Sequence, residues 1–202
     1  MYSFFFIFSF LTIIFFNIGK ESKPTLAFQV VVSHSKKFMH VSEHFYGTMN
    51  DKQITVNDTF PVDVWHGDKF KLRRFILINK HGVAIEYHGV WLAVDGGYQK
   101  IACFIDPMHN RYSFNEVAFS EWLESVRKDV ECAFGILKIR FRFLRGFVIY
   151  HDPLIIEYAF KTATMLHNML LEWDGLDDFN WENTDHTIVI MFLYNICLEI
   201  MI

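Results

Sequence analysis

The sequence predicts a mixed α/β domain, and three features carry the prediction. Residues 26–33 alternate between apolar and polar in the manner of a strand that buries one face. The apolar run 90–94 ends at Asp95 and two glycines, which is typical of a buried strand that stops at a sharp turn. Apolar residues at helical spacing then mark a long helix at about 120–144. The 202 residues suffice for one domain with a core.

The first half of the chain begins with a predicted hairpin. Residues 26–32 form its first strand, the polar residues 33–36 its turn, and residues 38–45 the returning strand. Residues 50–60 form a short helix or a loop. Residues 69–80 have the pattern of an amphipathic helix, which precedes the buried strand at 90–94.

The second half of the chain is predicted to be helical. Ser120 is a plausible N-cap for the long helix, and Gly146 follows its end. A second helix spans about 153–173, with Pro153 in its first turn. This helix is apolar on most sides, which predicts that it is buried.

The two ends of the chain differ from the middle. Residues 1–18 carry no charged side chain and consist mainly of Phe and Ile. As a helix they would span about 27 Å, close to the bilayer core of about 30 Å. We expect a segment foreign to the domain or, alternatively, a membrane anchor. The domain then covers 19–175 and leaves 176–202 as a tail, whose apolar run 186–202 is either a core helix or a second stray end.

The overall charge gives no signal for nucleic-acid binding. The net charge is −4 and the pI is about 6.2, so DNA binding would require a local basic patch. Cys103, Cys132 and Cys197 are odd in number and far apart, which fits buried thiols better than disulfides or a zinc site.

Two carboxylates are candidates for a metal site. Asp95 ends the predicted strand at 90–94, and Glu131 lies on the long helix, with 35 residues between the two. Carboxylate oxygens suit Mg²⁺ or Mn²⁺, and such ions activate water in phosphodiester hydrolysis. Each residue also has a structural alternative. Glu131 can form an ion pair with Arg127 one turn earlier, and Asp95 can be an ordinary turn residue.

Basic residues follow Glu131 at helical spacing. Lys138, Arg142 and Arg145 fall on the face of the helix that carries Glu131, and Arg140 lies to one side. These four residues are candidates for binding DNA phosphates. The structural alternative is a solvated helix face.

Four blocks in order resemble PIF/Harbinger-type transposases, of the DDE endonuclease superfamily. The longest is Trp122-Leu123-Glu124-Ser125-Val126-Arg127-Lys128-Asp129-Val130-Glu131-Cys132-Ala133-Phe134-Gly135-Ile136-Leu137-Lys138, which resembles the helix of the third acid. The other blocks are Asn50-Asp51-Lys52, Val94-Asp95-Gly96-Gly97-Tyr98 and Leu166-His167-Asn168-Met169-Leu170. The resemblance covers roughly residues 19–175.

The resemblance implies an RNase H-like fold, a mixed sheet flanked by helices. It implies a triad of acids that binds two divalent metals, Mg²⁺ or Mn²⁺, and hydrolyses phosphodiesters in DNA. Asp95 matches the second acid and Glu131 the third. The implied setting is the nucleus, with DNA and a Myb-like DNA-binding protein as partners.

The chain departs from this pattern at the first acid. The family carries that aspartate on a first strand upstream of residues 25–32, where this chain has only residues 1–18, without Asp or Glu. We therefore expect a sheet that lacks its first strand and a nuclease that is inactive. Spare carboxylates have no expected position and are not assigned: Asp51, Asp58, Asp63 and Asp106. The alternative is a non-catalytic domesticated module that binds DNA or protein.

Overall fold

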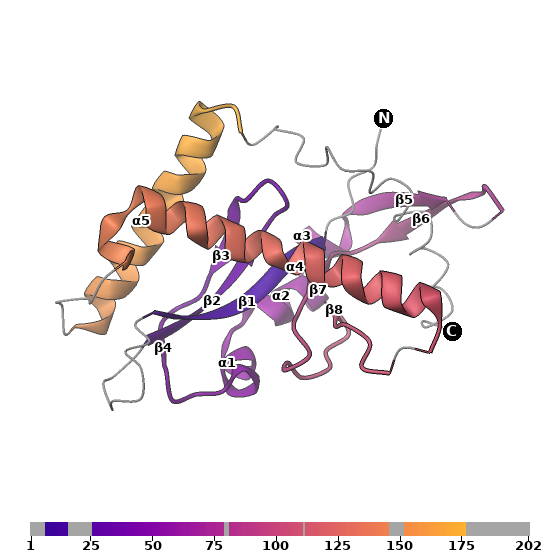
Figure 1. The fold of residues 1–202 in the computed structure, drawn as a ribbon, viewed down its shortest axis with the longest axis horizontal. Coiled ribbons are helices and arrows are strands. Elements are labelled where there is room, and N and C mark those ends of the chain that lie inside the picture. The colour runs from indigo at the N-terminus through magenta and orange to yellow at the C-terminus, as the bar shows by residue number, and fades with distance from the viewer. Residues whose placement is uncertain (1–6, 16–25, 79–80, 111, 146–151, 177–202) are drawn as a thin grey trace.

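A six-stranded mixed sheet forms the centre of the protein, with helices on both faces and a separate two-stranded hairpin at one side (Figure 1). The prediction of a mixed α/β domain is confirmed. The computed structural model describes residues 7–15, 26–78, 81–110, 112–145 and 152–176.

The main sheet has the strand order β3-β2-β1-β7-β8, with β4 also paired to β2. Its strands are β1 (Ile7–Phe15), β2 (Leu26–Val32), β3 (Phe38–Val41), β4 (Phe45–Tyr46), β7 (Trp91–Ala93) and β8 (Phe104–Ile105). The hairpin consists of β5 (Arg74–Ile78) and β6 (Ala84–His88). The helices are α1 (Asp51–Asn57), α2 (Phe60–His66), α3 (Asp68–Lys71), α4 (Phe114–Arg140) and α5 (Pro153–Trp173), with a 3₁₀ turn η1 (Arg142–Arg145).

Strand β1 lies at the centre of the sheet. It pairs antiparallel with β2 over Ser9–Phe15 and parallel with β7 over Ile7–Ser9. The prediction that the sheet lacks a strand here is therefore wrong. A central strand between packed layers requires an apolar run and no alternation, and β1 is such a run. The division of the chain at residues 18 and 175 stays a prediction.

The apolar ends of the chain raised the possibility of a membrane anchor. Among the residues that the structure describes, no helix is long and apolar enough to cross a bilayer. Residues 186–202 lie outside the described residues.

Strand β2 is buried along its whole length, which corrects the prediction of one buried face. Phe28 packs against Phe160 of α5, with ring centroids 4.9 Å apart. On the opposite face Val31 packs in a cluster with Val64 of α2. Helices therefore cover both faces of β2. For this reason the alternation of apolar and polar residues along β2 does not mark a solvent-exposed face.

Helix α4 begins six residues earlier and ends four residues earlier than predicted. Ser113 and Glu116 form a capping box, in which each side chain accepts from the other's backbone N–H. The backbone N–H groups of Ser113 and Tyr112 both donate to the Glu116 carboxylate and lower its pKa. Ser120, the predicted N-cap, is buried inside the helix.

Two other helix predictions are also corrected. The predicted helix at 69–80 is wrong, because α3 stops at Lys71 and β5 follows in the hairpin. The bounds of α5 are confirmed, but its complete burial is wrong. Large apolar side chains of α5 are exposed, namely Leu154, Ile155, Tyr158, Met165, Leu166, Met169, Leu170 and Trp173.

Residues of the Leu166–Leu170 block, in α5, form hydrogen bonds with the β2–β3 hairpin. His167 is fully buried, and its Nε2–H donates to the carbonyl of Lys36 at 3.0 Å. Burial lowers the pKa of His167. The Asn168 amide accepts from the backbone N–H of Phe38 at 2.9 Å and donates to its carbonyl at 2.8 Å. Asn168 thus pairs with the exposed edge of β3 as a neighbouring strand would.

A buried ion pair joins the same hairpin to α4. The Lys36 ammonium contacts the Asp129 carboxylate, and only 7% of the Lys36 side chain is exposed. His34 Nδ1 lies 2.8 Å from the other oxygen of Asp129. Lys36 adopts a left-handed backbone conformation with a φ of 65°, which turns the hairpin tip. The position of α4 on the sheet therefore depends on residues nearly a hundred positions earlier.

Candidate functional site

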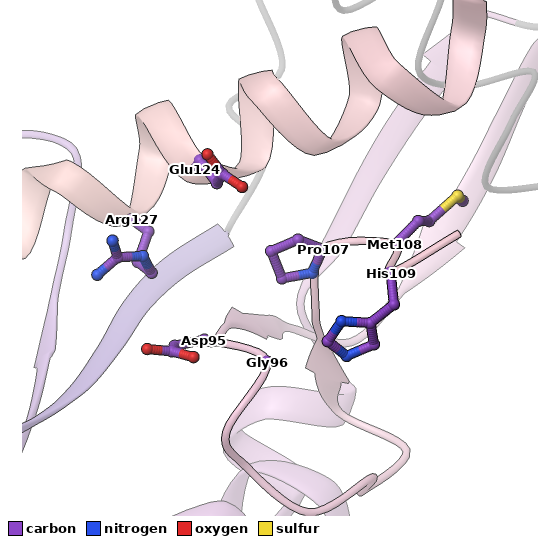
Figure 2. A pocket seen from close by; sticks show the side chains of 7 residues that line it. All are labelled: Asp95, Gly96, Pro107, Met108, His109, Glu124 and Arg127. Carbon is purple, nitrogen blue, oxygen red and sulfur yellow. The ribbon is translucent and has the colours of Figure 1, made fainter. Parts of the chain in front are cut away.

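A cleft of about 670 Å³ opens where β7 ends beneath α4 (Figure 2). One wall is the turn that follows β7, the second is the loop that follows β8, and the third is the side of α4. The lining residues are Asp95, Gly96, Pro107, Met108, His109, Glu124 and Arg127.

Asp95 follows β7 after a single residue, Val94, and is exposed. Its Oδ1 accepts from the backbone N–H of Gly97 at 2.8 Å, and its carbonyl accepts from the N–H of Tyr98 at 3.2 Å. These bonds are those of the predicted turn residue. They also fix the carboxylate at the edge of the cleft. Asp95 can therefore be an ordinary turn residue and still bind a metal ion.

A second aspartate meets Asp95 at Gly97. A Cβ atom on Gly97 would lie 3.6 Å from Asp95 Oδ1 and 3.9 Å from Asp51 Oδ2. One oxygen from each of two aspartates therefore lies within 4 Å of that position. Asp51 was one of the unassigned carboxylates in the sequence.

The N-terminus of α1 holds Asp51 in place. Asn50 and Gln53 form a capping box at the start of this helix. The Thr55 hydroxyl donates to the Asp51 carbonyl at 2.6 Å and accepts from the side chain of buried Gln29 at 3.0 Å. Through these bonds β2 positions the first turn of α1.

Helix α4 places one glutamate in the lining of the cleft, whereas the predicted site residue Glu131 is not among the lining residues. Glu124 lines the cleft together with Asp95. Glu131 lies two turns further along, and its Oε1 accepts from Arg127 Nη1 at 3.0 Å, the predicted ion pair. An exposed pair at this spacing contributes about 0.3–0.5 kcal/mol, so it does not prevent Glu131 from binding a cation instead.

Three lining residues with ionisable side chains were missed in the sequence: His109, Glu124 and, as part of the cleft, Arg127. Glu124 precedes Glu131 by seven residues, the same helical spacing that linked Glu131 to Lys138. His109 follows β8, which runs parallel to β7, and parallel neighbours end at one edge of a sheet. The His109 ring packs on Gly96, because a Cβ there would lie 2.8 Å from His109 Cε1.

The predicted basic stripe is divided by the end of α4. Lys138 is exposed on the helix, whereas Arg142 and Arg145 are exposed on η1, so the expectation of one helical face is wrong. Arg145 Nε donates to the carbonyl of Lys138 at 2.6 Å. Arg140 turns toward α5 and donates to Asp174 at 3.1 Å.

The donor set at the cleft suits a hydrated divalent cation better than a closed protein cage. Within the described ranges, no group of three or more His, Cys, Asp or Glu side chains is close enough together to hold a metal ion. Mg²⁺ commonly uses one or two carboxylates and keeps several waters, and Asp95 and Glu124 are the two carboxylates that line the cleft. Cys103 is buried, which raises its pKa to about 11, whereas Cys132 is exposed on α4. The prediction of buried thiols is therefore confirmed for Cys103 and wrong for Cys132, and Cys197 lies outside the described residues.

Comparison with known proteins identifies a family. Residues 14–178 match a family described as plant transposon protein. No curated protein and no solved structure matches the chain.

Proposed function

The chain belongs to the plant transposon protein family, and from that premise we propose that it is a transposase-derived nuclease domain of the PIF/Harbinger kind with an incomplete catalytic site. Its ancestral reaction is metal-dependent hydrolysis of phosphodiester bonds in DNA. Asp95 and Glu131 are the proposed metal ligands, with Mg²⁺ or Mn²⁺ as the metal. The proposed location is the nucleus, with DNA and a Myb-like protein as partners.

The packing of α4 across the sheet that contains β7 is the main support for this proposal. Asp95 follows β7, and α4, which carries Glu131, contacts β1, β2 and β7 across the sheet. An RNase H-like fold requires a first strand at the centre of the sheet, and β1 holds that place next to β7. The architecture therefore supports the family's nuclease fold.

The sequence of β1 explains why the site is incomplete. The family's first acid belongs on the first strand, but the residues of β1 are Ile-Phe-Ser-Phe-Leu-Thr-Ile-Ile-Phe. Without a carboxylate from this strand, two metal ions lose a shared ligand. Two-metal catalysis should then fall steeply, whereas the binding of one cation can persist.

Cleavage of DNA tests the incomplete site. We expect the full chain, incubated with supercoiled DNA and Mg²⁺ or Mn²⁺, to nick it no faster than its Asp95→Asn variant. The reason is that the chemical step requires both ions, and one carboxylate of the three is missing. Nicking is measured as loss of the supercoiled form on a gel. Metal-dependent nicking that Asp95→Asn abolishes would show that the nuclease is active and overturn this part of the proposal.

A second candidate function is a non-catalytic DNA-binding module. The observation that favours it is the exposure of Lys138 and Arg142 near the end of α4. We expect the double variant Lys138→Ala/Arg142→Ala to bind DNA with a shallower salt dependence, by about 0.9 in log Kd against log salt for each lost phosphate contact. Affinity is measured by fluorescence anisotropy at several salt concentrations.

Arg140→Ala is the matched control for this experiment. It removes the same type of charge from the same segment, but Arg140 bonds to Asp174 and to the carbonyl of His167. Its salt slope should equal that of the unmodified chain. Equal slopes for all three proteins would exclude Lys138 and Arg142 as phosphate contacts.

A further inference from the structure

We propose that the outward side of α5 is the interface through which two copies of this chain associate. The eight large apolar side chains that α5 exposes, from Leu154 to Trp173, form what we call the α5 stripe. The inference goes beyond the proposed function, because the α5 stripe and the cleft share no residue. Figure 1 shows α5 at the end of the molecule opposite the β5–β6 hairpin.

The α5 stripe runs along the whole length of the helix. Successive members lie three, seven, four and four residues apart and so share one side, namely Ile155, Tyr158, Met165, Met169 and Trp173. The opposite side of α5 packs into the core beneath the sheet. The helix is therefore apolar both where it is buried and where it meets water. A helix that is apolar all round is normally buried on all sides.

The outward side of α5 is almost free of charge. Of the exposed residues of α5, only Thr162 and Glu172 are polar. The Glu172 carboxylate lies 2.7 Å from the Lys37 ammonium. The other two charged residues of the helix pair with each other, since Lys161 donates to Glu157 at 2.6 Å. An apolar partner can therefore cover the α5 stripe without leaving a buried charge unpaired.

The area of the α5 stripe equals what one partner of a stable complex contributes. Its side chains are between 41% and 90% exposed. Aromatic side chains present about 150–250 Å² and large aliphatic ones somewhat less, so the α5 stripe leaves on the order of 800 Å² open to water. The largest apolar patch on a monomer is typically about 300–600 Å², whereas each partner in a stable interface buries about 800 Å².

A second copy of the chain is the partner that these observations favour. An apolar surface without charge is complementary to itself, and a two-fold axis brings the same patch of both copies together. The α5 stripe lies inside the region 14–178 that matches the family. The apolar residues 186–202, which could also cover it, lie beyond that match. A second copy is always supplied by the same domain, whereas that segment is not.

Sedimentation velocity of the full chain over a series of concentrations tests the inference. We expect a reversible dimer. Met165 lies near the middle of the α5 stripe, so it approaches its own copy whether the two helices run parallel or antiparallel. Met165→Glu and Met165→Lys should each raise the Kd of the dimer at least about a hundredfold, because like charges then face one another. An equimolar mixture of the two variants should restore the dimer, because the facing charges are then opposite.

Val56→Glu is the matched control, because Val56 of α1 is 70% exposed and Met165 is 67% exposed. This variant should dimerise like the unmodified chain. A dimer that Met165→Glu leaves unchanged has its interface elsewhere and overturns the proposal. Thermal unfolding shows whether each variant is folded.

A full chain that stays monomeric at every concentration also overturns the proposal. Hydroxyl-radical labelling of Met165, read by mass spectrometry, then identifies the alternative. Protection of Met165 in the monomer would mean that another part of the same chain, such as residues 186–202, covers the α5 stripe. Full labelling would mean that the α5 stripe is open to a different protein.

Discussion

Removal of residues 1–15 is expected to abolish cooperative folding. These residues include β1, which is hydrogen-bonded to β2 on one side and to β7 on the other. Without β1 the sheet separates into two parts, and the facing edges of β2 and β7 expose their backbone donors and acceptors. The loss should equal the whole stability of an ordinary domain, about 5–15 kcal/mol.

Urea unfolding followed by near-ultraviolet circular dichroism measures this effect. The control is a chain that begins at Ile7, which keeps all of β1 and should unfold like the full chain. A point substitution gives a second test without truncation. Leu11 pairs with Val30 in the register of β1 and β2, and Leu11→Pro removes a backbone donor from a central strand. A truncated chain with an unchanged unfolding midpoint would show that β1 is not part of the folded sheet.

The second large effect is expected at the buried ion pair between the hairpin and α4. Asp129→Ala leaves the Lys36 ammonium buried without its carboxylate, which typically costs about 3–5 kcal/mol. It also removes the acceptor that His34 contacts. We therefore expect a large decrease in the free energy of unfolding, measured in urea at pH 7.

The double variant Lys36→Met/Asp129→Leu separates the loss of the pair from the cost of a buried ammonium that has lost its carboxylate. Replacing both partners by apolar side chains removes the buried charge, and such replacements are often neutral or stabilising. It should therefore be clearly more stable than Asp129→Ala. If the two variants are equally unstable, packing rather than charge explains the effect. Because Asp129 lies between Arg127 and Glu131 on α4, this pair also helps to fix the side of the helix that faces the cleft.

Several elements could be predicted because their signals are local. The bounds of α5 follow from Asp152, whose side chain caps the helix, and from Pro153 in the first turn. The β2–β3 hairpin follows from the polar turn between two apolar runs. The strand that leads to Asp95 follows from its apolar run and the glycines after it. In each case the residues that decide the structure are neighbours in the chain.

The order of the four family blocks was also readable from the sequence, and with it the membership in a transposon protein family. The roles of residues within those blocks were not. His167 and Asn168 belong to one block, yet they bond to the β2–β3 hairpin about 130 residues earlier. Periodicity describes one face of one helix and cannot identify the partner of that face.

The sequence by itself determined the α/β class, the position of Asp95 at the end of a strand and the lack of an acid in residues 1–18. Only the tertiary structure placed β1 at the centre of the sheet, because an apolar run fits a buried strand and an apolar helix equally well. Only the tertiary structure also brought Asp51 to Asp95 at Gly97. That proximity depends on the path of the chain between α1 and β7, and no pattern within either segment encodes it.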